Sequence, residues 1–207
     1  MNFGIHSRVL VIGAHPDDIE VGCGSSLCKW KRNNTTIVAA VMTCENETRR
    51  KEQIKAFEVL GITDYIIGDF EDGKIPHNKE SVSFIDNIIN KYQINTIITH
   101  SEFDSHQDHH NTMKSAMSSG RLVNNFFHFD TIPFRRINYQ ELSKPTIYSN
   151  IDNFIDYKIK ALQCHKSQLP RFPEGWIEKI ISEANYKGNS VNVKYAESFY
   201  CKKLYIH

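Results

Sequence analysis

The chain lacks the features that mark several classes of protein. No apolar run approaches the roughly 20 residues that a membrane-spanning helix needs, and the amino terminus lacks the basic, apolar and small-residue order of a secretory signal. The sequence therefore predicts a cytoplasmic protein with no membrane span. Its 25 basic and 24 acidic residues leave a formal net charge of +1, which gives no reason to expect a nucleic-acid partner.

Cysteine is sparse and widely spaced. The five cysteines form no C-x-x-C pair, so neither a zinc ribbon nor a redox pair is expected, and we expect reduced, mostly buried thiols. No repeat, low-complexity tract or linker divides the 207 residues. That length is enough to bury a sizeable core, and we expect a single domain over residues 1–207.

Apolar runs alternate with amphipathic runs in the first 120 residues. The expected strands cover residues 9–12, 37–42, 65–67 and 96–99. The expected helices cover residues 19–32, 48–60, 82–92 and 111–118. Strands that alternate with helices in this way predict an α/β, Rossmann-like three-layer fold with a mostly parallel sheet.

The second half of the chain is less regular. We expect strands at 146–148 and 199–205 and helices at 154–165 and 176–186. Residues 126–129 (Phe-Phe-His-Phe) are consistent either with core or rim packing or with one more buried strand. Residues 135–144 are polar and are expected to form a surface loop near the site.

A polar turn follows the first expected strand. His15, Asp17 and Asp18 stand in the run Ala-His-Pro-Asp-Asp, between that strand and the next helix. In an open α/β sheet such a turn lies at the carboxyl edge, where ligands bind. Adjacent carboxylates repel each other unless a cation or hydrogen bonds stabilise them. The pattern therefore indicates a site for a divalent metal ion.

A second polar cluster, His106-x-Asp108-His109, comes after the fourth expected strand. If the first and fourth strands are close in the sheet, the two clusters form one pocket with nitrogen and oxygen donors, of the kind that zinc accepts with an open position for water. Spacing alone does not choose between His109 and His110 as a ligand, because both lie within a helical turn of His106.

These two motifs resemble the PIG-L/LmbE-like family of zinc-dependent N-deacetylases. Looser fragments along the chain support the resemblance. They are Arg49-x-x-Glu52-x-x-x-Ala56-x-x-x-Leu60-Gly61, Lys160-Ala161-Leu162, His165-x-Ser167-Gln168 and Tyr195-Ala196-Glu197-x-Phe199. The resemblance implies a metal-dependent hydrolase that removes an N-acetyl group from an N-acetylglucosamine-type sugar or sugar conjugate, with a small-molecule sugar as its partner.

The resemblance also implies the roles of the motif residues. His15, Asp18 and His109 are expected to bind one Zn²⁺, with Fe²⁺ as the alternative metal. Asp17 is the expected general base, and His106 is expected to stabilise the oxyanion or donate a proton. Asp108 is expected to hydrogen-bond His106 and keep it protonated and oriented. Either Asp17 or His106 could protonate the leaving amine.

The substrate contacts depart from the family pattern. Many relatives have an Arg-Gly-Glu-type segment after the second strand, where this chain has Thr-Cys-Glu-Asn-Glu. Arg49 and Arg50, slightly later, are the candidates to bind substrate, although Arg49 could equally pair with Glu52 along its helix. The alternative functions are deacetylation of a glucosaminyl conjugate in low-molecular-weight thiol biosynthesis, or metal or sugar binding without turnover. The sequence leaves open whether the protein forms a homo-oligomer.

Further polar residues stand near the two motifs or in the looser fragments. His110 is expected to be an ordinary residue at a helix start, and His100 is either a partner of the site or a strand end. His165 and the pair Ser167-Gln168 are expected to close a helix end near the pocket, with a substrate contact as the alternative. Glu197 is either a partner of the site or a buried polar anchor.

Overall fold

A seven-stranded sheet forms the centre of the computed structural model, which describes residues 7–129, 145–171 and 174–205. The strands lie in the order β3-β2-β1-β4-β5-β7-β6. Their bounds are β1 Arg8–Gly13, β2 Thr36–Thr43, β3 Asp64–Phe70, β4 Thr96–Thr99, β5 Asn125–Phe129, β6 Ile147–Asn150 and β7 Ala196–Lys203. The first five strands pair in parallel, and β7 pairs antiparallel with both β5 and β6.

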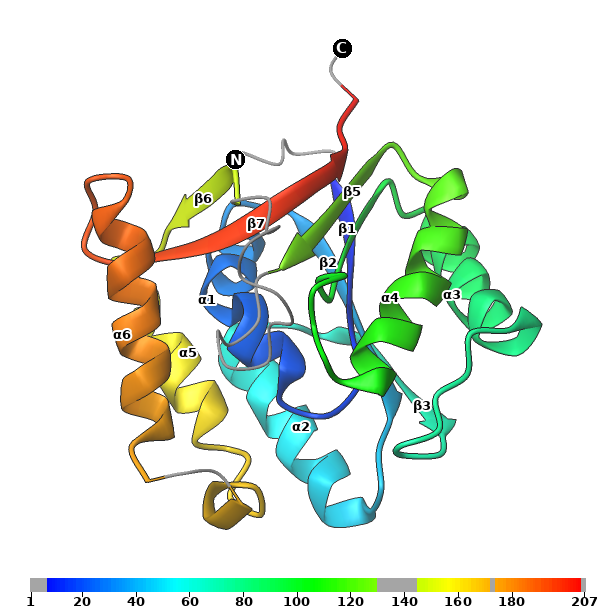
Figure 1. The fold of residues 1–207 in the computed structure, drawn as a ribbon, viewed down its shortest axis with the longest axis horizontal. Helices are drawn as coiled ribbons and strands as arrows, with labels where there is room; N and C mark the ends of the chain where they lie inside the picture. Colours follow the sequence, from blue (N-terminus) through cyan, green and yellow to red (C-terminus); the bar gives the residue numbers. More distant parts are fainter. Residues whose placement is uncertain (1–6, 130–144, 172–173, 206–207) are drawn as a thin grey trace.

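Helices cover both faces of the sheet, as Figure 1 shows. One face packs against α1 and α2 with α5 beside them, and the other packs against α3 and α4, while α6 lies against β7. The helix bounds are α1 Asp18–Arg32, α2 Glu47–Leu60, α3 Lys79–Tyr92, α4 Gln107–Ser119, α5 Ile155–Leu162 and α6 Trp176–Asn189. In the part of the chain that is described, no helix is long and apolar enough to cross a bilayer.

The central strand β1 shows why the fold has three layers. Val9 and Val11 belong to the core beneath α1 and α2, and Leu10 and Ile12 belong to the core beneath α3 and α4. Successive side chains of a strand point to opposite faces, so a continuous apolar run is buried on both sides. The predicted α/β class with a mostly parallel sheet is confirmed.

Most of the predicted elements are present, with shifted ends. Residues 125–129 form strand β5, which settles the open choice for that segment, and the terminal strand begins at Ala196 rather than at Phe199. The predicted loop at 135–144 lies outside the described residues.

Helix α1 is bent at Cys23, whose φ of −151° and ψ of 18° are not helical. In a regular helix the Ser25 N–H donates to the Val21 carbonyl. Here Ser25 N donates to Glu197 Oε1 at 3.1 Å, and Val21 O accepts from Lys158 Nζ at 2.8 Å. Lys158 Nζ also donates to Glu197 Oε1 at 2.6 Å. Glu197 is therefore a buried anchor for the bent helix.

Loss of this ion pair should destabilise the fold. Lys158→Met would leave the carboxylate of Glu197, which is 2% exposed, without its cation. Breaking a buried pair from one side costs about 3–5 kcal/mol, so urea unfolding should show a lower free energy of unfolding by that amount. Lys160→Met, on the exposed side of the same helix, should change it little. Equal effects of the two substitutions would contradict this role.

His128 in β5 is fully buried, and neither of its ring nitrogens has a hydrogen-bond partner among the described residues. Burial, together with the charges of Lys202 and His100, lowers the pKa of His128 to about 3. Between pH 6.5 and about pH 3, His128 therefore stays neutral in the folded chain but is protonated in the unfolded chain.

Stability should consequently fall as the pH drops from 6.5 toward 3, because the unfolded state binds the extra proton. The His128 contribution is fully present above pH 6.5 and is lost at up to about 1.4 kcal/mol per pH unit below it. His128→Leu should flatten this slope in urea unfolding measured across the range. His77→Leu, at an exposed position, should follow the parent chain. A slope unchanged by His128→Leu would refute the assignment.

Candidate metal and active site

Two loops that are distant in sequence meet at the carboxyl edge of the sheet. Strand β1 pairs in parallel with β4, with Val11 opposite Ile98. The loops that follow Gly13 and Thr99 therefore leave the sheet side by side. They are joined directly, since Ala14 N donates to His100 Nε2 at 2.9 Å. The predicted convergence of the two polar clusters is confirmed.

Three side chains bring nitrogen and oxygen donors together at this edge. His15 Nδ1 lies 3.3 Å from His109 Nε2 and 3.4 Å from Asp18 Oδ2. His109 Nε2 lies 3.2 Å from Asp18 Oδ1. In a tetrahedral set with bonds of about 2.0–2.1 Å, donor atoms lie about 3.3 Å apart. The spacing and the chemistry of these donors therefore fit a bound zinc ion.

The imidazole of His109 is oriented by the carboxylate of Asp104. His109 Nδ1 contacts Asp104 Oδ2 at 2.7 Å, which directs Nε2 toward His15 and Asp18. Burial lowers the pKa of His109, but the facing carboxylates of Asp18 and Asp104 raise it to about 10. The carboxylates at this position thus favour a positive charge. The described residues form three candidate metal-binding groups, which are His15-His106-His109, Asp18-His100-His109 and His15-Asp72-Asp108. The proposed ligands are thus spread over these groups, and His110 belongs to none of them.

His15 is held on its other side as well. Its backbone N–H donates to Asp18 Oδ2 at 2.7 Å. Its Nε2 lies 3.1 Å from Asp108 Oδ2 and 2.9 Å from Asp72 Oδ1. A ring whose Nε2–H donates to carboxylates presents Nδ1 as the lone pair, which is the atom that faces Asp18 and His109.

The structure corrects the expected contact of Asp108. Its carboxylate accepts from Gly73 N at 2.7 Å and from Ile75 N at 3.1 Å, and it also faces His15. Its backbone N–H, not its carboxylate, is bonded to His106, at 3.2 Å from Nδ1. The reason is local, because His106 caps α4 and Asp108 in the first turn points its side chain into the loop before α3.

Asp17 occupies a strained turn. Its φ of 96° is in the left-handed region, which is uncommon for a residue with a side chain and is often found at functional sites. Its backbone N–H donates to Gln53 Oε1 at 3.1 Å. Burial and the charge of Asp18 raise the pKa of Asp17 to about 7, against the lowering effects of His165 and Arg49.

Arg49 and Arg50 have different surroundings. Arg49 Nη2 donates to Pro16 O at 2.9 Å, and the same atom lies 3.8 Å from Asp17 Oδ2. The expected alternative, in which Arg49 pairs with Glu52, is not what the structure has, because Glu52 binds Ser167 instead. Arg50 pairs with Asp69 and is not among the residues that line the pocket described below, and its contact with substrate stays a prediction.

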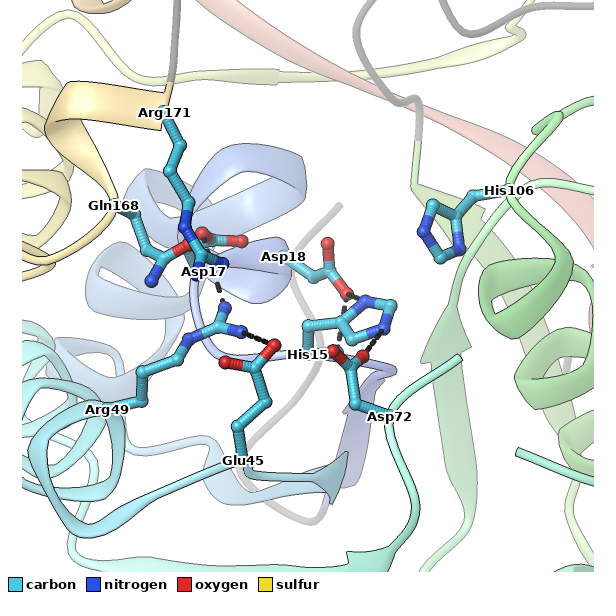
Figure 2. Close-up of a pocket in the computed structure, with 9 residues that line it drawn as sticks. All are labelled: His15, Asp17, Asp18, Glu45, Arg49, Asp72, His106, Gln168 and Arg171. Atoms are coloured by element: carbon cyan, nitrogen blue, oxygen red, sulfur yellow. Dashed lines mark hydrogen bonds and ion pairs between the residues drawn. The ribbon is translucent and has the colours of Figure 1, made fainter. Parts of the chain in front are cut away.

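A pocket of about 240 Å³ lies at this edge of the sheet, and Figure 2 shows the residues that line it. The lining residues are His15, Asp17, Asp18, Glu45, Arg49, Asp72, His106, Gln168 and Arg171. Sequence reasoning did not assign Asp72, Glu45 or Arg171 to the site. The available signals were the polar loop after β3 and the unusual segment after β2. Asp72 shares a hydrogen bond with Glu45, which lowers the pKa of Asp72 and raises that of Glu45.

Metal content tests the donor set. His15→Ala removes one of three donors and should lower the zinc bound per chain at least tenfold, as measured by elemental analysis after dialysis against limiting chelator. His77→Ala changes an exposed histidine outside the pocket and should leave zinc binding as it is. Full zinc occupancy in the first variant, with native circular dichroism, would remove His15 from the set.

Two curated proteins are similar in sequence to this chain. The chain is 29% identical over 172 residues to the uncharacterized deacetylase YaiS of Escherichia coli K12, covering 77% of this chain and 90% of that protein. It is 23% identical over 227 residues to the diacetylchitobiose deacetylase of Thermococcus kodakarensis, covering 97% of this chain and 85% of that protein.

Solved structures share the fold. The conserved protein TT1542 from Thermus thermophilus has a TM-score of 0.84 at 22% identity, with 97% of each chain covered. GalB, the 4-carboxy-2-hydroxymuconate hydratase of Pseudomonas putida, has a TM-score of 0.83 at 18% identity, covering 97% of this chain and 98% of that one. The family model for PIG-L, GlcNAc-PI de-N-acetylase, matches residues 10–119, which include both motif loops. The chain belongs to the PIG-L family of deacetylases.

Proposed function

We propose that this protein is a metal-dependent deacetylase that hydrolyses the N-acetyl group of an N-acetylglucosamine-type sugar or sugar conjugate. The observation that carries the proposal is the donor set of His15, Asp18 and His109, spaced for one metal ion beside the carboxylate of Asp17. Membership of a deacetylase family supports the reaction, and the relative that acts on diacetylchitobiose supports the substrate class.

Zn²⁺ is the metal that we propose, because two imidazoles and one carboxylate form a common three-ligand zinc site. Fe²⁺ is the alternative, since the same ligand types suit it. When bound, such an ion would polarise the amide carbonyl and lower the pKa of water.

Asp17 is the proposed general base. It lies beside Asp18 on the same turn, and its raised pKa of about 7 makes it a stronger base than an ordinary aspartate while it can still lose its proton near neutral pH. The guanidinium of Arg49, 3.8 Å away, faces one of its oxygens. Asp17 takes a proton from the attacking water and can return it to the nitrogen of the sugar, so that acetate and a free amine are the products.

His106 is the proposed oxyanion donor. Its Nδ1 accepts the backbone N–H of Asp108, so a neutral ring carries its hydrogen on Nε2. The ring lines the pocket next to the ring of His15, with 4.9 Å between their centroids. A donor at that place stabilises the negative charge that develops on the acyl oxygen.

Acetate release is the direct test. The zinc-loaded protein should release acetate and free amine in equal amounts from N-acetylglucosamine or diacetylchitobiose. Glucosaminyl conjugates of the kind used in thiol biosynthesis belong in the same panel and test the alternative substrate class. No acetate from any member, with sugar binding retained in calorimetric titration, would favour a binding module instead.

The role of Asp17 generates a sharper prediction. Asp17→Asn should lower kcat for acetate release at least about a hundredfold, as expected for loss of a general base, while bound zinc stays at one ion per chain. Asp69→Asn changes an exposed carboxylate and should have neither effect. Activity retained by Asp17→Asn would refute the role, and zinc lost with activity would make Asp17 a ligand rather than the base.

A further inference from the structure

One wall of the pocket comes from a segment that the family model does not cover. Gln168 and Arg171 line the pocket, whereas the matched residues end at 119. Both residues follow α5, and Arg171 ends the short 3-10 helix Leu169–Arg171. Figure 2 shows them on the other side of Asp17 and Asp18 from His106.

Glu52 fixes this wall to the body of the protein. Its Oε1 accepts from Ser167 N at 2.8 Å, and its Oε2 accepts from Ser167 Oγ at 2.6 Å. Hydrogen bonds to a carboxylate are short and strong. Glu52 lies one turn after Arg49 in α2, so one helix face positions both the pocket arginine and the turn that carries Gln168.

A second attachment lies two residues before Ser167. His165 is fully buried, and its Nε2 lies 3.6 Å from Glu20 Oε2, which is an ion-pair distance and not a hydrogen bond. Glu20 Oε1 in turn accepts from Gln53 Nε2 at 2.7 Å, and Gln53 Oε1 accepts the Asp17 N–H. The segment is therefore tied to α1 and α2, the helices that also hold the proposed general base.

This framework places a carboxamide in the pocket. Gln168 is 6% exposed, and its Nε2 donates to Ser167 Oγ at 3.1 Å. Its Oε1 and its second N–H have no hydrogen-bond partner within the described residues, while the side chain lines the pocket. An amide with one acceptor and one donor left over suits a hydroxyl group, which both donates and accepts.

We propose that Gln168 binds the substrate through a hydroxyl of the sugar ring that carries the acetamido group; this inference rests on the proposed function. The acyl oxygen belongs on the side of His106 and the donor set, and the methyl group forms no hydrogen bonds. The sugar ring, on the other side of the scissile bond, is the part of the substrate that extends toward Gln168. The clamp of Glu52 and Ser167 makes Gln168 a rigid specificity determinant.

The test pairs a near-isosteric substitution with deoxy substrates. Gln168→Met keeps the size of the side chain and removes both hydrogen-bonding atoms. It should raise KM about tenfold for N-acetylglucosaminides, with kcat changed less and zinc content and Tm unchanged. The parent enzyme should discriminate against one of the 3-, 4- and 6-deoxy analogues, and Gln168→Met should lose that discrimination, which a merely structural role would not produce.

Three further variants complete the design. Gln163→Met, at an exposed position after α5, should keep the parent KM and the parent discrimination. Ser167→Ala removes the hydroxyl that bonds both Glu52 and Gln168 and should raise KM, whereas Ser167→Thr restores a hydroxyl and should recover most of the affinity. An unchanged KM and unchanged deoxy discrimination in Gln168→Met would overturn the proposal.

Binding without turnover separates this inference from the proposed function. The same sugars can be titrated calorimetrically into Asp17→Asn and into the double variant with Gln168→Met. If the parent releases no acetate but the double variant binds N-acetylglucosamine about tenfold more weakly than Asp17→Asn, the proposed reaction fails and the role of Gln168 stands. Equal binding by the two variants overturns the role of Gln168, whatever the activity of the parent.

Discussion

The parallel pairing of β1 with β4 is the constraint on which the site depends. In a parallel pair both strands point their carboxyl ends the same way, so the turns after Gly13 and Thr99 leave the sheet together. The bond from Ala14 N to His100 Nε2 then fixes one turn to the other. Residues some ninety positions apart thereby become neighbours, and the proposed donor set draws on both motifs.

The pKa values of the adjacent aspartates Asp17 and Asp18 are shifted in opposite directions. Burial alone would raise the pKa of both, but the imidazoles of His109 and His100 hold the pKa of Asp18 well below its ordinary value. Asp17 faces weaker compensation, and its pKa rises to about 7. One carboxylate is thereby suited to a cation and its neighbour to a proton, which is the division of roles that hydrolysis of an amide requires.

The sequence was sufficient for the strand order along the chain, the two motif loops and their meeting, because these follow from apolar periodicity and from the geometry of parallel sheets. The sequence was insufficient where a contact depends on how the loops of different strands are placed relative to one another. Asp72 reaches His15 only because the loop after β3 leaves the same edge. Arg49 and Arg50 look equivalent in sequence, yet one residue turns a helix by about 100°, so only Arg49 faces the pocket.

The second half of the chain is part of the site and not an appendage to it. Lys158 and Glu197 bond the backbone groups at the bend of α1, and Ser167 binds Glu52 in α2. The proposed donor set comes from the loop after β1, the start of α1 and the first turn of α4, whereas part of the wall comes from the segment after α5. In the proposed reaction, catalysis and sugar recognition therefore fall to separate segments that are tied to the same helices. The fold alone does not determine the reaction, since a hydratase shares it. The reaction depends on the side chains that these helices hold at the pocket.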